Sequence, residues 1–138
     1  MKNKICIVAA NYYPEISKSL IIGATNELKK NGFKVEKKFF VPGIFEIPLL
    51  ISKKINSWDA FIALGCVIKG KTPHFNLISS ATTLAIMNLS VEHRKPIGNG
   101  IIVCFNKKQA QERSNSYSKK NKGREAAKAV LTLLKITK

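Results

Sequence analysis

Four short apolar runs, each followed by a stretch with helical periodicity, constrain the fold of this chain more than any other feature. We expect strands over residues 5–9, 34–41, 60–64 and 97–105, and helices over residues 15–30, 44–55, 73–93 and 107–113, with a last helix from Gly123. Strands that alternate with helices and are buried on both faces are typical of parallel sheets. The sequence therefore predicts an α/β fold in which layers of helices enclose a parallel sheet.

The turn after the third strand is the most distinctive stretch, since residues 65–75 read GCVIKGKTPHF. Thr72 suits the N-cap of the following helix and Pro73 suits its first position. Free backbone N–H groups and the helix dipole favour an anion at such a helix start. The same positive end opposes protonation of His74, so we expect a neutral imidazole suited to general-base chemistry beside an anion site.

This stretch also satisfies the phosphate-loop pattern GxxxxGK[ST] between a strand and a helix. A nucleotide-hydrolysing site needs a second-strand aspartate for magnesium, and the one aspartate here, Asp59, precedes a strand. Gly65 and Val67-Ile68 look like the end of the strand itself, which leaves too short a turn. We therefore interpret the match as fortuitous.

The length of the chain predicts one domain over residues 1–138. The apolar run at residues 5–10 is too short to span a bilayer, so we expect a cytoplasmic protein without a membrane partner. Three cysteines without a CxxC pair are interpreted as buried hydrophobes rather than metal ligands or disulfides. The net charge of +16 is spread along the chain in lysine pairs. We interpret it as solvated surface charge rather than a nucleic-acid footprint.

Three segments together resemble the lumazine synthase family: VPGIFEIP at residues 41–48, GCVIKGKTPHF at residues 65–75, and NKG at residues 121–123 after Glu112-Arg113. The resemblance covers essentially the whole chain. It implies a flavodoxin-like three-layer α/β/α sandwich with a four-stranded parallel sheet. It also implies condensation of 5-amino-6-ribitylaminouracil with 3,4-dihydroxy-2-butanone 4-phosphate, without a metal or organic cofactor. The enzyme is expected to be a homo-oligomer, a pentamer or multiples of it, whose active sites lie between subunits.

The resemblance also assigns roles to individual residues. His74 is expected to transfer protons, and Arg113 of a neighbouring subunit to hold the departing phosphate. The expected substrate-binding residues are Tyr12, Ile44, Phe45, Glu46, Val67, Ile68, Gly70, Lys71, Thr72, Asn99 and Lys122.

The chain departs from the family's usual pattern at five positions. Asn11-Tyr12 stands where Arg-Phe is common, and Asn99 stands where some members place a second aromatic residue. Ile44 replaces a common alanine, and Lys71 makes the phosphate turn more basic. A different class of function stays open beside the enzyme: a non-catalytic basic module that binds flavin precursors or RNA.

Overall fold

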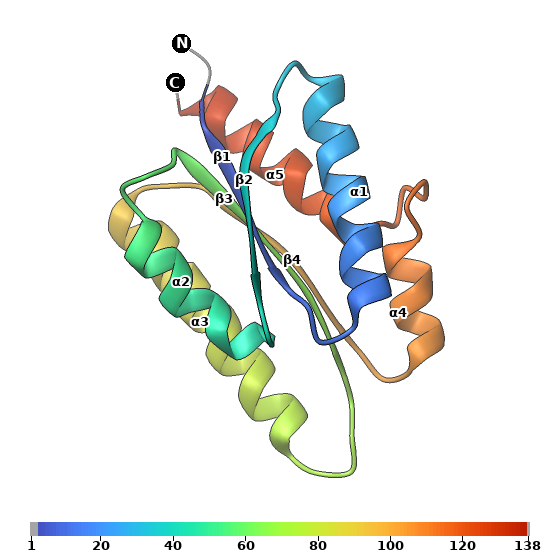
Figure 1. Ribbon diagram of the computed structural model, residues 1–138. Coiled ribbons are helices and arrows are strands. Elements are labelled where there is room, and N and C mark those ends of the chain that lie inside the picture. The colour runs from blue at the N-terminus through green and yellow to red at the C-terminus, as the bar shows by residue number, and fades with distance from the viewer. Residues whose placement is uncertain (1–2, 138) are drawn as a thin grey trace.

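The computed structural model describes residues 3–137, which form a parallel sheet between two layers of helices (Figure 1). The four strands lie in the order β2-β1-β3-β4, and every pairing is parallel. Helices α1, α4 and α5 cover one face of the sheet, and α2 and α3 cover the other. The predicted α/β/α sandwich on a four-stranded parallel sheet is confirmed. The elements in chain order are β1 (Ile5–Ala10), α1 (Pro14–Lys30), β2 (Val35–Val41), a 3-10 turn (Ile44–Glu46), α2 (Ile47–Lys54), β3 (Ala60–Ile68), α3 (His74–His93), β4 (Ile97–Cys104), α4 (Lys107–Ser114) and α5 (Lys122–Ile136).

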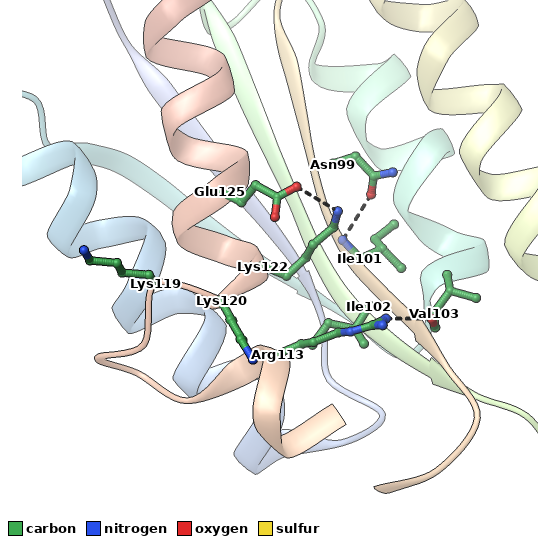
Figure 2. A pocket seen from close by; sticks show the side chains of 9 residues that line it. All are labelled: Asn99, Ile101, Ile102, Val103, Arg113, Lys119, Lys120, Lys122 and Glu125. Carbon is green, nitrogen blue, oxygen red and sulfur yellow. Dashed lines mark hydrogen bonds and ion pairs between the residues drawn. The ribbon is translucent and has the colours of Figure 1, made fainter. Parts of the chain in front are cut away.

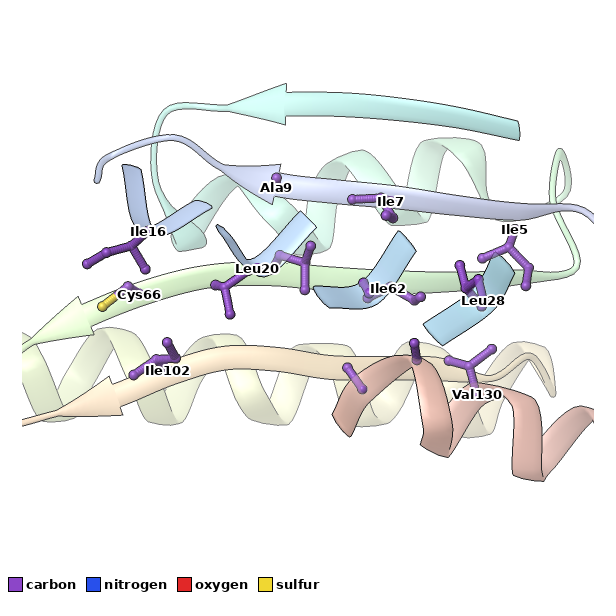
Figure 3. Close-up of a cluster of buried hydrophobic side chains, with 14 of the residues drawn as sticks. Ile5, Ile7, Ala9, Ile16, Leu20, Leu28, Ile62, Cys66, Ile102 and Val130 are labelled. Carbon is purple, nitrogen blue, oxygen red and sulfur yellow. The ribbon is translucent and has the colours of Figure 1, made fainter. Parts of the chain in front are cut away.

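The core has two halves because successive strand side chains point to opposite faces. On one face Ile5, Ile7 and Ala9 of β1 pack with residues of α1 and α5 (Figure 3). On the other face Cys6, Val8 and Ala10 pack with residues of α2 and α3. The central strands β1 and β3 are therefore buried on both sides, as their apolar sequences predict.

Strand β2 differs from the prediction that all strands are buried on both faces. It lies at the edge of the sheet, and Glu36, Lys37, Lys38 and Phe40 are exposed. Charged and apolar residues are mixed in this strand because an edge strand has a neighbouring strand on one side only. The expectation of full burial is right for β1 and β3, and it is wrong for β2 and for the other edge strand, β4, where Asn99 and Val103 are exposed.

Strand β3 runs four residues further than the apolar pattern suggested, to Ile68. Gly65 therefore lies inside the strand, where a Cβ would meet Ile44 Cγ2 at 2.8 Å and the Ala10 Cβ at 3.1 Å. The glycine is needed for packing between strand and 3-10 turn. The expectation that Gly65 and Val67-Ile68 belong to the end of the strand is thus confirmed.

The predicted N-cap of the third helix is wrong. Helix α3 begins at His74, and the residue before it is Pro73 with φ −69° and ψ −1°, so Thr72 lies one position too early to cap the helix. No side chain caps this end, and the Pro73 carbonyl accepts from the N–H groups of Asn76 and Leu77. The first turn of α3 therefore keeps uncapped N–H groups.

Close helix packing explains the glycines of β4. A Cβ on Gly98 would lie 2.6 Å from the Ala126 carbonyl oxygen, and one on Gly100 would lie 2.4 Å from Leu64 Cδ2. Glycines inside a strand commonly mark the close approach of another backbone or a ligand, and at Gly98 that neighbour is the backbone of α5. Among residues 3–137, no helix is long and apolar enough to cross a bilayer.

Candidate active site

A pocket lies at the carboxyl ends of β1 and β3, where parallel α/β sheets usually bind ligands. Its cavity volume is about 190 Å³. The lining residues come from the β1–α1 loop, the segment after β2, the end of β3 and the start of α3: Tyr12, Tyr13, Gly43, Ile44, Cys66, Val67, Ile68, His74 and Ile78. We call this the His74 pocket.

The side chains of the His74 pocket differ in how firmly they are held. Ile44 is buried between the sheet and α3, whereas His74 is exposed as the first residue of α3. Tyr12 is 72% exposed, and its ring meets Tyr13 edge-on with centroids 4.9 Å apart. The pocket therefore has an apolar floor, with an aromatic ring and an imidazole at its mouth.

Backbone contacts fix the loops that carry these residues. The Asn11 N–H donates to the Val41 carbonyl at 2.8 Å, and the Ser17 hydroxyl donates to the Ala10 carbonyl. Glu46 accepts from the Gly43 N–H through Oε1 at 2.9 Å, which closes the turn after β2. The strand ends around the pocket are thereby tied to one another.

The thiol at the pocket floor is held in its neutral form. Burial, followed by the neighbouring Cys104, raises the pKa of Cys66 to about 12. Burial also raises the pKa of Tyr13, with smaller contributions from Cys66, Tyr12 and Cys104. Because the thiolate is the reactive form of cysteine, Cys66 is not suited to nucleophilic catalysis.

A second pocket lies along the free edge of β4, between that strand and the helices α4 and α5 (Figure 2). Its cavity volume is about 610 Å³, and we call it the Arg113 pocket. Four cations and one carboxylate are among its lining residues, which are Asn99, Ile101, Ile102, Val103, Arg113, Lys119, Lys120, Lys122 and Glu125. Such an excess of positive charge favours an anionic ligand.

Two of the cations have partners in this pocket. Arg113 donates from Nη1 to the Val103 carbonyl at 3.3 Å, and Lys122 pairs with Glu125 at 3.2 Å (Figure 2). Asn99 accepts the Ile101 N–H through Oδ1 at 3.1 Å. The Arg113 guanidinium keeps further N–H donors for a ligand.

The turn between β3 and α3 is the third part of the predicted site. A Cβ at Gly70 would meet nothing within 4 Å, and Lys71 and Thr72 are exposed. Lys69 lies over the Phe105 ring at 5.4 Å from its centroid, and that ring lies 6.1 Å from the ring of Phe75. These contacts pack both ends of the turn against Phe105.

The structure divides the predicted site residues into groups. Tyr12, Ile44, Val67, Ile68 and His74 meet in the His74 pocket. Asn99, Arg113 and Lys122 meet in the Arg113 pocket. Phe45, Glu46, Gly70, Lys71 and Thr72 line neither of these two pockets, and Phe45 is 66% exposed.

Several lining residues were not predicted. Ile78 follows His74 by one helical turn, so the two share a face of α3, and that spacing was readable from the sequence. Lys119 and Lys120 form one of several lysine pairs, and nothing in the sequence distinguishes this pair from the others. Within residues 3–137, no three His, Cys, Asp or Glu side chains come together to hold a metal ion.

Comparison with known proteins shows similarity over the whole chain. The family model of 6,7-dimethyl-8-ribityllumazine synthase matches residues 2–138. A protein named 6,7-dimethyl-8-ribityllumazine synthase from Nitrobacter hamburgensis is 41% identical over 137 residues, covering 94% of this chain and 83% of the relative. One of the same name from Bartonella bacilliformis is 40% identical over 138 residues, covering 97% and 90%. Another from an Arthrobacter species is 36% identical over 129 residues, covering 93% and 80%.

Proposed function

The chain belongs to the 6,7-dimethyl-8-ribityllumazine synthase family, and on that premise we propose how its two pockets carry out the family's reaction. The enzyme condenses 5-amino-6-ribitylaminouracil with 3,4-dihydroxy-2-butanone 4-phosphate, a step of riboflavin biosynthesis. The products are 6,7-dimethyl-8-ribityllumazine, phosphate and water. The alternative of a non-catalytic flavin-precursor- or RNA-binding module has no support among relatives of this similarity.

The observation that carries the proposal is the convergence of Tyr12, Ile44 and His74 on one pocket at the carboxyl ends of the strands. The pyrimidine stacks on Tyr12, which has an exposed ring at the pocket mouth. The backbone of Val67 and Ile68 hydrogen-bonds the ring edge. Phe45 and Glu46 bind the ribityl chain, for which Glu46 offers the carboxylate oxygen that does not close the Gly43 turn.

His74 acts as the general base and acid. The amine of one substrate attacks the ketone of the other, and loss of water gives an imine. Removal of a proton beside the imine then expels phosphate from the neighbouring carbon. Attack of the ribityl-bearing nitrogen on the remaining carbonyl carbon, with loss of a second water, closes the new ring. An imidazole can both accept and donate a proton, so it is suited to move these protons.

Arg113 binds the phosphate, with Lys122 and the turn of Gly70, Lys71 and Thr72. A guanidinium forms paired hydrogen bonds to phosphate oxygens that strengthen as negative charge develops on the leaving group. The excess of cations in the Arg113 pocket supports this role. Asn99 lies in the same pocket and contacts the ring from the side opposite Tyr12.

The active site is completed by a second copy of the chain, in a pentamer or an assembly of pentamers. The His74 pocket, at about 190 Å³, is smaller than the roughly 300 Å³ at which ligand pockets begin. Arg113 and Lys122 line a different pocket of the same chain. Both observations support an arrangement in which the Arg113 pocket of one subunit faces the His74 pocket of the next.

Exposed apolar side chains on α3 support the same assembly. Leu77, Leu84, Met87 and Val91 are each at least 59% exposed, and they recur at helical spacing along one helix. A contiguous apolar surface of this kind is typical of an interface. We place the enzyme in the cytoplasm, with two small-molecule substrates and no nucleic-acid partner.

The test is formation of the lumazine product, followed by its absorbance, with purified protein and both substrates. The uncatalysed condensation and an Arg113→Ala variant run beside it. We expect product well above both controls. Turnover equal to the blank, from protein that is folded and assembled, would overturn the proposal and lead to ligand- and RNA-binding assays instead.

A further inference from the structure

A buried asparagine links two of the four cations of the Arg113 pocket, Arg113 and Lys122. Asn121 is fully buried, although it lies between exposed Lys120 and half-buried Lys122. Its side-chain nitrogen donates to the carbonyls of Ser114 at 3.0 Å, Asn115 at 3.0 Å and Ser19 at 3.1 Å. One amide therefore joins the end of α4, the start of α5 and the middle of α1.

The same side chain also caps α5. Its Oδ1 accepts the Arg124 N–H at 2.9 Å, so Asn121 satisfies one of the free donors at the start of that helix. The carbonyls of Ser114 and Asn115 lie at the end of α4, where no further helical turn supplies donors. The amide thus satisfies both helix ends at one point.

The positions of these helix ends decide where the two cations lie. Arg113 immediately precedes Ser114, and Lys122 immediately follows Asn121. Arg113 is therefore one residue away from a carbonyl that the Asn121 side chain holds, and Lys122 adjoins Asn121 itself. Neither cation is itself buried, so the backbone under it sets its starting position.

The Asn121 side chain packs tightly against α1. A Cβ at Gly23 would lie 2.2 Å from Oδ1 of Asn121, and a Cβ at Gly123 would lie 2.2 Å from the Leu20 carbonyl oxygen. Both positions are glycine, so α1 approaches the amide as closely as a backbone can. The link between α4 and α5 is thereby fixed against the rigid core of the subunit.

We propose that Asn121 is a positioning residue for the phosphate clamp, because its amide locks the end of α4 to the start of α5 and so holds Arg113 and Lys122 at the spacing that a phosphate requires. The inference rests on the proposed function of Arg113. It predicts that loss of the amide donors weakens recognition of the phosphorylated substrate and leaves recognition of the pyrimidine intact.

The variant Asn121→Asp tests this inference. It keeps the size of the side chain and the acceptor for Arg124, and it replaces the donor nitrogen by an oxygen that repels the carbonyls of Ser114 and Asn115. We expect KM for the phosphorylated substrate to rise about tenfold, the size of effect that loss of one well-placed hydrogen bond produces, with KM for the pyrimidine unchanged. Asn106→Asp is the matched control, since Asn106 caps α4 through its side-chain oxygen but is exposed, and we expect no change in either KM.

A double-mutant cycle separates positioning from general destabilisation. If Asn121 acts through Arg113, Asn121→Asp has little further effect on that KM in an Arg113→Ala background. An equal effect in both backgrounds, or an unchanged KM in a folded and assembled Asn121→Asp variant, would overturn the inference. If the aspartate variant does not fold, Asn121→Ser, which keeps a cap acceptor and one donor, takes its place in the same cycle. An Arg113→Ala variant with unchanged KM would instead refute the phosphate clamp, and the positioning role with it.

Discussion

The two pockets are built in different ways. The floor of the His74 pocket is the core itself, since Ile44 is 3% exposed and Cys66 is 6% exposed. The Arg113 pocket lies on an edge strand and two helix ends, and its cations are exposed or half-buried. Substitutions of the buried residues of the first pocket should therefore change stability, and substitutions of the cations in the second should change activity alone.

The sharpest test of this comparison mixes two inactive variants. We expect His74→Ala and Arg113→Ala each to lose about 100-fold or more in kcat/KM, from loss of a general base and of an anion clamp. If the pockets of two copies form one site, random co-assembly in equal amounts restores about a quarter of the sites. The measurement is lumazine formation after the two variants are refolded together.

The control for mixing is each variant refolded alone, which should stay inactive. Mixed assemblies without recovered activity, shown to contain both variants by mass spectrometry, would refute the shared site. They would leave the two pockets of one chain as separate surfaces.

The variant Ile44→Ala tests the dependence of the His74 pocket on the core. Ile44 is buried against Gly65, and its truncation should lower the free energy of unfolding by about 2–4 kcal/mol. Thermal and urea denaturation measure the loss. Substrate turnover at low temperature should persist, because the family commonly has alanine here. An unchanged melting temperature would show that this pocket is not supported by the core in the way described.

The variant Lys122→Met tests the Arg113 pocket for the opposite behaviour. Its pair with Glu125 lies at the surface, where such pairs contribute about 0–1 kcal/mol, so the melting temperature should barely change. We expect KM for the phosphorylated substrate to rise about three- to tenfold and to become less sensitive to salt. Lys128→Met, an exposed lysine of the same helix, is the matched control. A large loss of stability without a KM effect would contradict the comparison.

The smallest expected effect is the reactivity of the Cys66 thiol. Its pKa of about 12 leaves about one thiolate in ten thousand at pH 8, so alkylation of the folded protein should be very slow and should accelerate as the pH rises. The unfolded thiol titrates first, near 9.0, so this group also lowers the stability of the fold between about pH 9 and 12. Iodoacetamide labelling followed by mass spectrometry measures the rate, with urea-unfolded protein as control. Rapid labelling of Cys66 in the folded state at pH 8 would contradict this assignment.

Much of the fold was predictable because the signals were local. Apolar runs located β1 and β3, and the helix patterns placed α1 and α3 to within a residue or two. The edge position of β2 was not predictable in this way, since strand order depends on packing between distant segments. Thr72 does not cap α3 for a different reason: the helix begins at His74, one residue later than predicted, and Pro73 occupies the cap position instead.

The site was predictable only in part. Motifs pointed to His74 and Arg113 and the resemblance placed them on different subunits, but the residues that line each pocket are visible only in the structure. Asn121 was noticed as part of a motif, yet its buried amide and three carbonyl partners are visible only in three dimensions. The sequence does not indicate that an asparagine is buried, because asparagine is a residue type found mostly at the surface.

The exposed edge of β2 has a consequence for how the protein behaves at high concentration. A free strand edge is a template for another chain, and natural proteins commonly protect such edges with lysines. Lys37 and Lys38 lie on this edge in a chain of net charge +16, so two copies repel each other as their sheets approach. At high salt concentration the repulsion between charges is screened, so that it acts over only a few ångströms. Precipitants rich in salt should therefore favour aggregation through β2, and dilute buffers should keep the protein dispersed.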